Sequence, residues 1–186
     1  MSAPPLIRPG LADDVGTATA IYAHHVRHGT ASFETVPPDA AEIARRRDAV
    51  LAAGWPWLVV ELERRVVGFA YAGAFRAREA YRYCVEDSIY LADDACGRGI
   101  GRWLLAELIG RCEAAGARQM VAVIGDSANT ASIAVHRALG FEPAGVLRSS
   151  GWKFGRWIDV VLMQRALGDG DRTPPEREFD ARDDRP

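Results

Sequence analysis

The sequence predicts an α/β domain built on a mixed sheet with helices on both faces. The main observation is the order of the apolar patterns, which gives two helices, a hairpin, a β-α-β-α unit and a second hairpin. Composition agrees with this, because 48% of the residues are hydrophobic and 26% are charged, as in globular proteins. The length of 186 residues suits one domain with one sizeable core.

The first half of the chain contains a short strand, two helices and a hairpin. Residues 6–8 predict a strand that ends at Pro9, and a helix follows Asp13 and Asp14. Its buried stripe has helical spacing and consists of Val15, Ala18, Ile21, Tyr22 and Val26. A second helix is predicted between Asp39 and Gly54. Residues 57–63 and 66–75 have the pattern of a hairpin.

The second half begins with a strand at about residues 87–92. A helix is predicted after the glycines at 97, 99 and 101, and it ends at Gly116. Residues 120–124 form a continuous apolar run, as expected of a strand covered on both faces. Asn129 is a predicted N-cap for a helix that stops at Gly140. Residues 146–152 and 157–163 predict the closing hairpin.

The end of the chain differs in composition from the rest. Residues 168–186 carry seven acidic and four basic side chains, with Phe179 as the one large apolar residue. Such a segment cannot bury enough apolar surface to order itself. We therefore predict a folded domain over residues 1–167 and a charged, disordered tail over residues 168–186.

Charge and cysteine content exclude several classes of protein. A formal charge of −2 argues against a nucleic acid or an anionic membrane as the main partner. Without a long apolar stretch or a signal peptide in the printed sequence, we expect a cytoplasmic protein. Three cysteines without zinc spacing predict reduced thiols and no structural metal. Among His24, His25 and His28 a metal site is conceivable, but a polar helix face fits better.

A glycine-rich segment separates a predicted strand from a predicted helix. Its residues are Cys96, Gly97, Arg98, Gly99, Ile100, Gly101 and Arg102. Bare backbone N–H groups at a helix start can hold a phosphate. The spacing matches neither the P-loop nor the dinucleotide fingerprint, and a glycine-rich turn without a ligand is the alternative.

Joined to two later segments, this loop resembles a known superfamily. The segments are Asn129-Thr130-Ala131-Ser132 and His136-Arg137-Ala138-Leu139-Gly140-Phe141. Together they resemble the pyrophosphate loop and the asparagine-helix-Gly-Phe element of the GNAT acyltransferases, which bind acetyl-CoA. The resemblance implies a mostly antiparallel, twisted sheet flanked by helices. Cys96 departs from the usual Gln or Arg, at a position that works through its main chain.

A closer resemblance covers nearly the whole domain. Residues 21–34, 75–81, 85–91 and 153–160 resemble the phosphinothricin and methionine sulfoximine N-acetyltransferases. The resemblance implies acetylation of the α-amino group of a small amino acid or analogue. It also implies a homodimer that uses acetyl-CoA as co-substrate and no metal.

Two residues are candidates for catalysis. An α-amine is mostly protonated at neutral pH, so its attack on a thioester needs a proton acceptor. Glu86 opens the strand beside which the resemblance places the acetyl group, and it would act directly or through one water. Its alternative is a strand-end carboxylate paired with Arg82 or Arg78. The resemblance places His136 where it would protonate the departing thiolate, although a packing role is an equal alternative.

The segment before Glu86 is the candidate for substrate recognition. Arg76 and Arg78 flank Ala77, and an arginine fork matches a carboxylate in two parallel hydrogen bonds. The resemblance extends the substrate site to Glu86, Asp87 and Ser88. The alternative is a solvated charged loop.

For acetyl-CoA, the candidates are strand backbone, the glycine loop and one side chain. The main chain of Ile89, Tyr90 and Leu91 would pair with the amide-rich pantetheine arm. Asn129 would add a side-chain hydrogen bond, with a pure N-cap role as its alternative. Residues 97–102 would bind the phosphates, mainly through backbone donors.

Two other functions compete with amino-acid acetylation. One is a protein N-terminal or polyamine acetyltransferase of the same fold, although the positive charges of Arg76, Arg78 and Arg82 argue against a polyamine substrate. The other is a non-catalytic CoA-binding module, which would keep the glycine loop and could lose Glu86 and His136.

Overall fold

The computed structural model describes residues 5–175, and within that range a 7-stranded sheet forms the centre of the fold. The strands are β1 (Leu6–Pro9), β2 (Trp57–Leu62), β3 (Arg65–Ala74), β4 (Cys84–Leu91), β5 (Gln119–Gly125), β6 (Glu142–Lys153) and β7 (Arg156–Ala166). Their order across the sheet is β1-β2-β3-β4-β5-β7-β6. β4 and β5 are parallel, and the other neighbours are antiparallel. The predicted mixed, mostly antiparallel sheet is confirmed.

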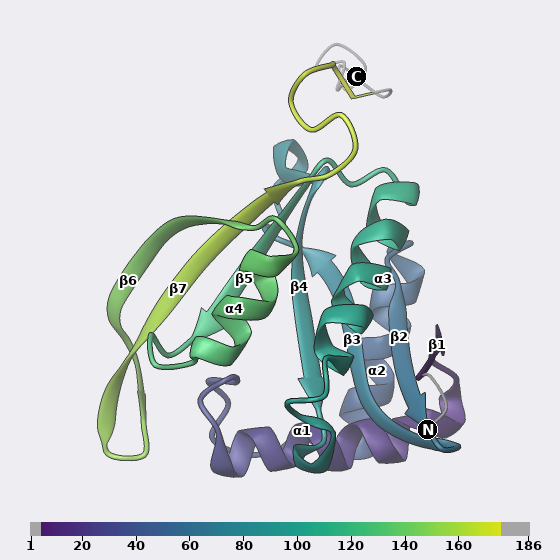
Figure 1. The fold of residues 1–186 in the computed structure, drawn as a ribbon, viewed down its shortest axis with the longest axis vertical. Coiled ribbons are helices and arrows are strands. Elements are labelled where there is room, and N and C mark those ends of the chain that lie inside the picture. Colours follow the sequence, from purple (N-terminus) through teal and green to yellow (C-terminus); the bar gives the residue numbers. More distant parts are fainter. Residues whose placement is uncertain (1–4, 176–186) are drawn as a thin grey trace, which may run out of the picture.

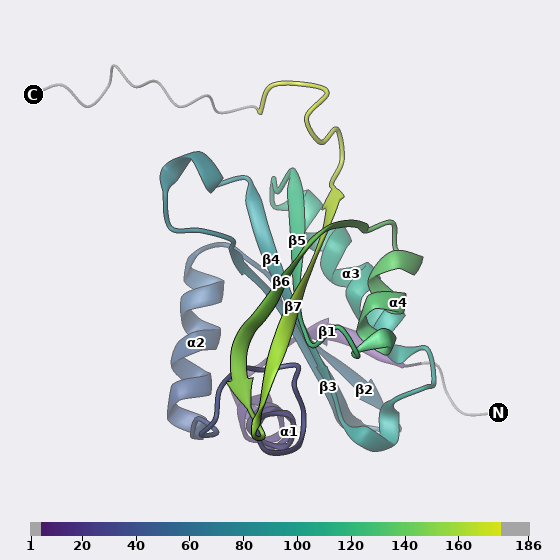
Figure 2. The same ribbon diagram turned by 90° about the vertical axis from the view of Figure 1, so that its left-hand side faces the viewer.

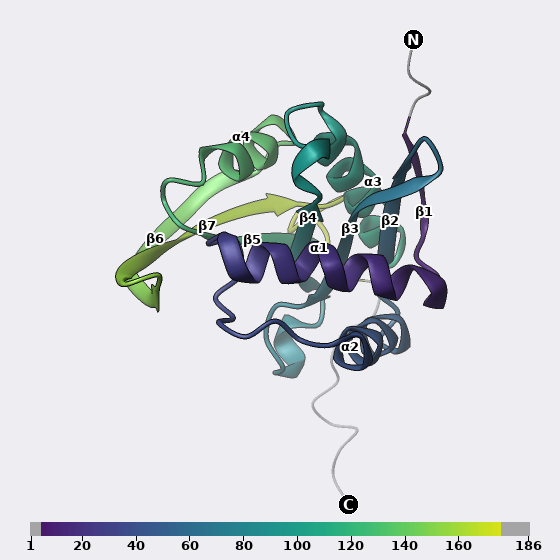
Figure 3. The ribbon, with the colours of Figure 1, turned by 90° about the horizontal axis from the view of Figure 1, so that it is seen from below.

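Two helices cover each face of the sheet, as predicted (Figures 2 and 3). The helices are α1 (Val15–His28), α2 (Ala40–Ala52), α3 (Ile100–Ala114) and α4 (Thr130–Ala138). α1 and α2 lie on one face, where the predicted stripe of α1 packs on Trp57, Val59, Phe69 and Tyr90. α3 lies on the other face together with α4, and the leucines of α3 pack against β2, β3 and β4. α1 therefore buries the face that its apolar spacing predicts, and α3 buries its leucines.

Short 3-10 turns and caps connect these elements. The turns are Ala12–Asp14, Glu79–Tyr81 and Asp93–Ala95. Asp39 caps α2 by accepting a hydrogen bond from the backbone N–H of Glu42 at 2.8 Å. Gly99 precedes α3 with a φ of 77°, a left-handed conformation that glycine adopts without strain.

Some boundaries differ from the predicted ones because pairing between strands extends them. β4 begins at Cys84 rather than at Asp87, since its first residues pair with β3 on one side and β5 on the other. β6 begins at Glu142 rather than at Val146, because its pairing with β7 starts at Glu142. Figure 1 shows the long β6–β7 hairpin reaching out from the body of the fold.

The segment after β7 continues away from the sheet. Arg118 donates hydrogen bonds to the carbonyl oxygens of Gly170 and Thr173, which holds residues 168–175 near the end of α3. The rest of the tail that the sequence predicts, residues 176–186, lies outside the described residues. No helix within residues 5–175 combines the length and apolar character needed to cross a membrane.

Candidate active site

The sheet opens between its two parallel strands. The register of β4 with β5 runs from Cys84–Gln119 to Asp87–Ala122, although both strands continue for at least three more residues. In Figure 1 the strands lie together at one end and diverge toward the other. A cleft of about 490 Å³ occupies this opening, with Ser88, Ile89 and Tyr90 on one wall and Val123, Ile124 and Gly125 on the other.

Glu86 lines the cleft at the point where the strands separate. Its carboxyl group is partly buried, and burial raises its pKa above the ordinary range for glutamate. The negative charge of Asp87 raises this pKa further, whereas the positive charge of Arg76 lowers it. The carboxyl group is therefore poised to exchange a proton at a higher pH than an exposed glutamate.

Asp87 and His136 form a hydrogen-bonded pair on the same cleft. Nε2 of His136 lies 3.1 Å from Oδ2 of Asp87, and Nδ1 lies 2.7 Å from the carbonyl oxygen of Ser132. The exposed fractions of the two side chains are 3% and 2%. Burial alone would lower the pKa of His136, but the hydrogen bond and charge of Asp87, together with the hydrogen bond to the Ser132 carbonyl, outweigh burial and raise it.

Asn129 precedes α4, where its side chain both caps the helix and lines the cleft. Its Oδ1 accepts a hydrogen bond from the backbone N–H of Ser132 at 3.2 Å, which is the N-cap bond that the sequence predicts. Its side chain also lines the cleft. The geometry therefore permits both the capping role and contact with a ligand.

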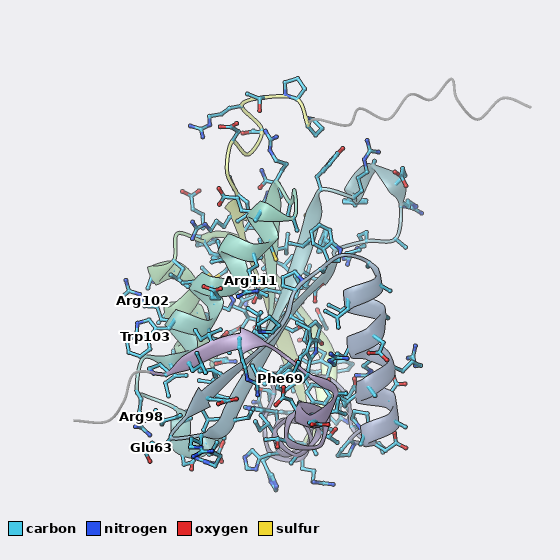
Figure 4. The ribbon with its side chains drawn as sticks, turned by 90° about the vertical axis from the view of Figure 1, so that its right-hand side faces the viewer. Glu63, Phe69, Arg98, Arg102, Trp103 and Arg111 are labelled. Atoms are coloured by element: carbon cyan, nitrogen blue, oxygen red, sulfur yellow. The ribbon has the colours of Figure 1, made fainter. Side chains whose placement is uncertain are left out.

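The glycine loop lies beyond the end of β4, at the start of α3. Gly97 and Gly99 have φ values of 72° and 77°, and a Cβ added at either position would meet nothing within 4 Å. The side chain of Ile100 packs in the core, so a ligand could contact this residue only through its main chain. Figure 4 shows Arg98 and Arg102 on the outer edge of the molecule, with exposed Trp103 beside Arg102. The loop thus offers backbone donors and guanidinium groups on an open surface.

The arginine segment lies between β3 and β4, outside the residues that line the cleft. Arg76, Ala77 and Arg78 are exposed. The guanidinium of Arg76 lies over the ring of Phe75, with 4.2 Å between its Cζ and the ring centroid. Its charge nevertheless acts on Glu86, which places Arg76 near the rim of the cleft.

A third wall of the cleft comes from the loop after α1, which was not assigned to the site from the sequence. Ser32, Phe33 and Glu34 line the cleft together with Tyr71 of β3. Glu34 accepts hydrogen bonds from Arg46 at 2.6 Å and from the hydroxyl of Tyr22 at 3.0 Å. Residues 21–34 belong to the segments that carry the family resemblance, but that resemblance gave Glu34 no role, and the fold is what brings this carboxylate to the site.

A buried lysine holds that loop in place. Lys153, the one lysine of the chain, donates from its Nζ to the carbonyl oxygens of Gly29 and Ser32 at 2.9 and 2.7 Å. Burial lowers its pKa. Phe33 closes the loop against Gly151, where an added Cβ would come within 2.3 Å of the phenyl ring.

The histidines of α1 have separate roles. Nε2 of His25 donates a hydrogen bond to the carbonyl oxygen of Leu91 at 2.7 Å, whereas His24 pairs with exposed Asp93 at 2.8 Å. Within residues 5–175, no group of three or more histidine, cysteine, aspartate or glutamate side chains is arranged to hold a metal ion.

Comparisons with known proteins agree on one family. The model of the Acetyltransferase (GNAT) family matches residues 19–141. Phosphinothricin N-acetyltransferase of Alcaligenes faecalis is 58% identical over 164 residues, which cover 88% of this chain and 83% of that protein. The L-methionine sulfoximine/L-methionine sulfone acetyltransferase of Pseudomonas aeruginosa is 42% identical, over 89% of this chain and 95% of that protein.

A solved structure resembles the whole domain. The crystal structure of a GNAT superfamily phosphinothricin acetyltransferase from Sinorhizobium meliloti, in complex with AcCoA, superposes with a TM-score of 0.90. The two chains are 50% identical, and the match covers 92% of each. The similarity therefore includes the strands and helices that form the cleft.

Proposed function

The chain belongs to the GNAT acetyltransferase family, and we propose that it transfers an acetyl group from acetyl-CoA to the α-amino group of a small amino acid or analogue. The relatives named above make phosphinothricin and methionine sulfoximine the first substrates to test. The observation that carries the proposal is the cleft between β4 and β5, with Glu86 partly buried at its apex.

The opening of the sheet suits a long, amide-containing cofactor. Beyond Asp87 the edge of β4 that faces β5 is not paired with it, so the main chain of Ile89 can bind an amide as a further strand would. The main-chain groups of Tyr90 instead face Phe69 of β3. The carbonyl of Leu91 already accepts from His25, which leaves its N–H for this role. Asn129 approaches from the opposite wall.

The glycine loop suits the phosphates of acetyl-CoA. Gly97, Gly99 and Gly101 precede or begin α3, whose N-terminus carries partial positive charge. The open space in front of Gly97 and Gly99 permits a close approach to the main chain. Arg98 and Arg102 add charge at the rim, so binding does not require a lysine.

Glu86 is the proposed proton acceptor for the amine. Attack forms a C–N bond and breaks the C–S bond, and two protons leave the ammonium nitrogen while one joins the departing sulfur. A carboxylate with a raised pKa can take a proton at neutral pH and return it to water after each turnover. Ser88 and Asp87, which also line the cleft, would help to hold the amine.

Release of CoA thiol in the presence of phosphinothricin and of methionine sulfoximine tests the activity and the role of Glu86. Glu86→Gln keeps the shape of the side chain but removes the base, so we expect kcat at neutral pH to fall about a hundredfold or more. The affinity for acetyl-CoA should change little. Glu107→Gln, at a half-buried position on α3 away from the cleft, is the matched control and should retain wild-type kcat. Full activity of Glu86→Gln would assign the proton to another group.

Recognition of the substrate carboxylate is proposed for Arg76 and Arg78, with Ala77 between them. Arg76→Gln and Arg78→Gln should each raise KM for the amino acid by roughly one to two orders of magnitude, because two charge-assisted hydrogen bonds are lost. Lysine at either position should restore part of the affinity. Arg45→Gln, at an exposed position of α2, serves as the control. Equal acetylation of an amino acid and its amide would show that these arginines are solvated surface residues without a role in recognition.

A homodimer is also part of the proposal. The β6–β7 hairpin exposes large apolar side chains at Val146, Leu147, Trp152, Phe154 and Trp157, each 46% to 61% exposed. β6 is the last strand of the sheet, and an exposed apolar edge of this kind favours association with a second copy. Sedimentation velocity should give a dimer for the wild type and a monomer for Trp157→Glu. A wild-type monomer at micromolar concentration would contradict the proposal.

We also propose a cytoplasmic location for the protein. The structure has Cys84, Cys96 and Cys112 as free thiols, as proteins of reducing compartments do. The proposed partner is a small-molecule substrate, with no nucleic acid or membrane involved.

A further inference from the structure

Both ring nitrogens of His136 face hydrogen-bond acceptors. The carbonyl oxygen of Ser132, at 2.7 Å from Nδ1, can only accept, so Nδ1 carries a proton. The hydroxyl of Ser132, at 3.4 Å from the same nitrogen, is the weaker contact. Nε2 then faces Oδ2 of Asp87 at 3.1 Å, and this hydrogen bond requires a proton of its own. An ionised Asp87 therefore requires a doubly protonated His136.

Two further titratable groups interact with Asp87 of the pair, Cys112 and Glu86. Cys112 of α3 faces Asp87, but burial, with a smaller contribution from the Asp87 charge, raises its thiol pKa to about 12. The Phe141 ring and the imidazole pack in a T-shaped arrangement, with 5.0 Å between ring centroids. Glu86, next to Asp87 on β4, points to the opposite face of the sheet, as consecutive strand residues do.

The charges along the cleft indicate what a doubly protonated His136 would do. Among the described residues that line the cleft, Glu34, Glu86 and Asp87 are carboxylates, and His136 is the one side chain able to carry positive charge. Thioester aminolysis develops negative charge on the carbonyl oxygen and then on sulfur. A preorganised cation in a water-poor site stabilises such charge.

We propose that Asp87 is a positioning residue that keeps His136 doubly protonated, so that the cleft presents an imidazolium to the thioester. The inference rests on the proposed acetyl transfer and adds Asp87 of β4 as a partner that acts through His136 of α4. His136 then enters the reaction as a fixed cation. Because its two N–H groups are already bound to Asp87 and Ser132, it is not the proton donor to sulfur.

The second oxygen of Asp87 connects the pair to the substrate. Oδ1 is buried and has no hydrogen-bond partner among residues 5–175. A buried carboxylate oxygen without a donor is costly, so it is left open for a group that enters the cleft. An N–H of the bound amine is the donor that the proposed reaction brings there. Substrate binding would then complete the hydrogen bonding of the pair.

NMR titration of His136 tests the inference without reference to turnover. In the wild type, identified by comparison with His136→Gln, the imidazole should titrate well above the ordinary pKa of about 6.5. In Asp87→Asn the amide can donate to a neutral Nε2, so packing is retained and the need for the second proton is lost. We expect the proton affinity of His136 to fall at least tenfold in that variant.

The pH dependence of kcat/KM gives the second readout. The wild-type value should decline on the alkaline side as His136 loses its proton, and in Asp87→Asn this decline should move to lower pH by about one unit or more. Asp93→Asn is the matched control, because Asp93 forms an exposed pair with His24 outside the cleft. It should leave both the His136 titration and the profile unchanged.

Each result decides between the two claims. A wild-type His136 that titrates at or below its ordinary pKa overturns the inference, even if Asp87→Asn does not fold. An unchanged titration in a folded Asp87→Asn overturns it as well. If the wild type releases no CoA thiol with any amino acid, the proposed function fails, while the titration still reports whether Asp87 controls the protonation of His136.

Discussion

The point where the parallel pairing of β4 with β5 ends, at Asp87 and Ala122, determines where the cleft forms. β4 and β5 are each held on their outer side by an antiparallel neighbour, β3 and β7, so they can separate without losing their place in the sheet. The separation leaves main-chain groups on inner edges that an ordinary sheet would pair. A ligand with its own amides is the natural partner for those groups, and this explains why the site forms inside the sheet.

Separation of the strands also brings both faces of the sheet to one cavity. Glu86 and Asp87 are consecutive, and their side chains leave β4 on opposite sides. Only at a gap can both reach the same ligand, one from the side of α1 and α2 and the other from the side of α3 and α4. The loop that Lys153 anchors then closes the first side, and α4 closes the second. Two carboxylates with different environments thereby come to line one cleft.

Much of this arrangement could be predicted from the sequence, because its signals are local. The glycines before α3, the Asn129 cap and the apolar stripe of α1 each depend on neighbours within a few residues. The pairing of Asp87 with His136 spans 49 positions, and the contact of Lys153 with Gly29 spans 124. Such contacts form only when the order of strands in the sheet is set, so no spacing of residues along the sequence predicts them. Lys153 did carry one weak signal, as the single lysine among 23 basic residues.

Hydrogen–deuterium exchange with and without acetyl-CoA tests most directly whether the gap between β4 and β5 is the cofactor site. Acetyl-CoA should slow exchange of the backbone amides of Ile89, Leu91 and residues 97–101 by tenfold or more, because these N–H groups are left to donate to the ligand. Amides of β2, already paired on both sides, should exchange as before. Binding of acetyl-CoA that leaves the amides of Ile89, Leu91 and residues 97–101 unprotected would show that the cofactor binds elsewhere.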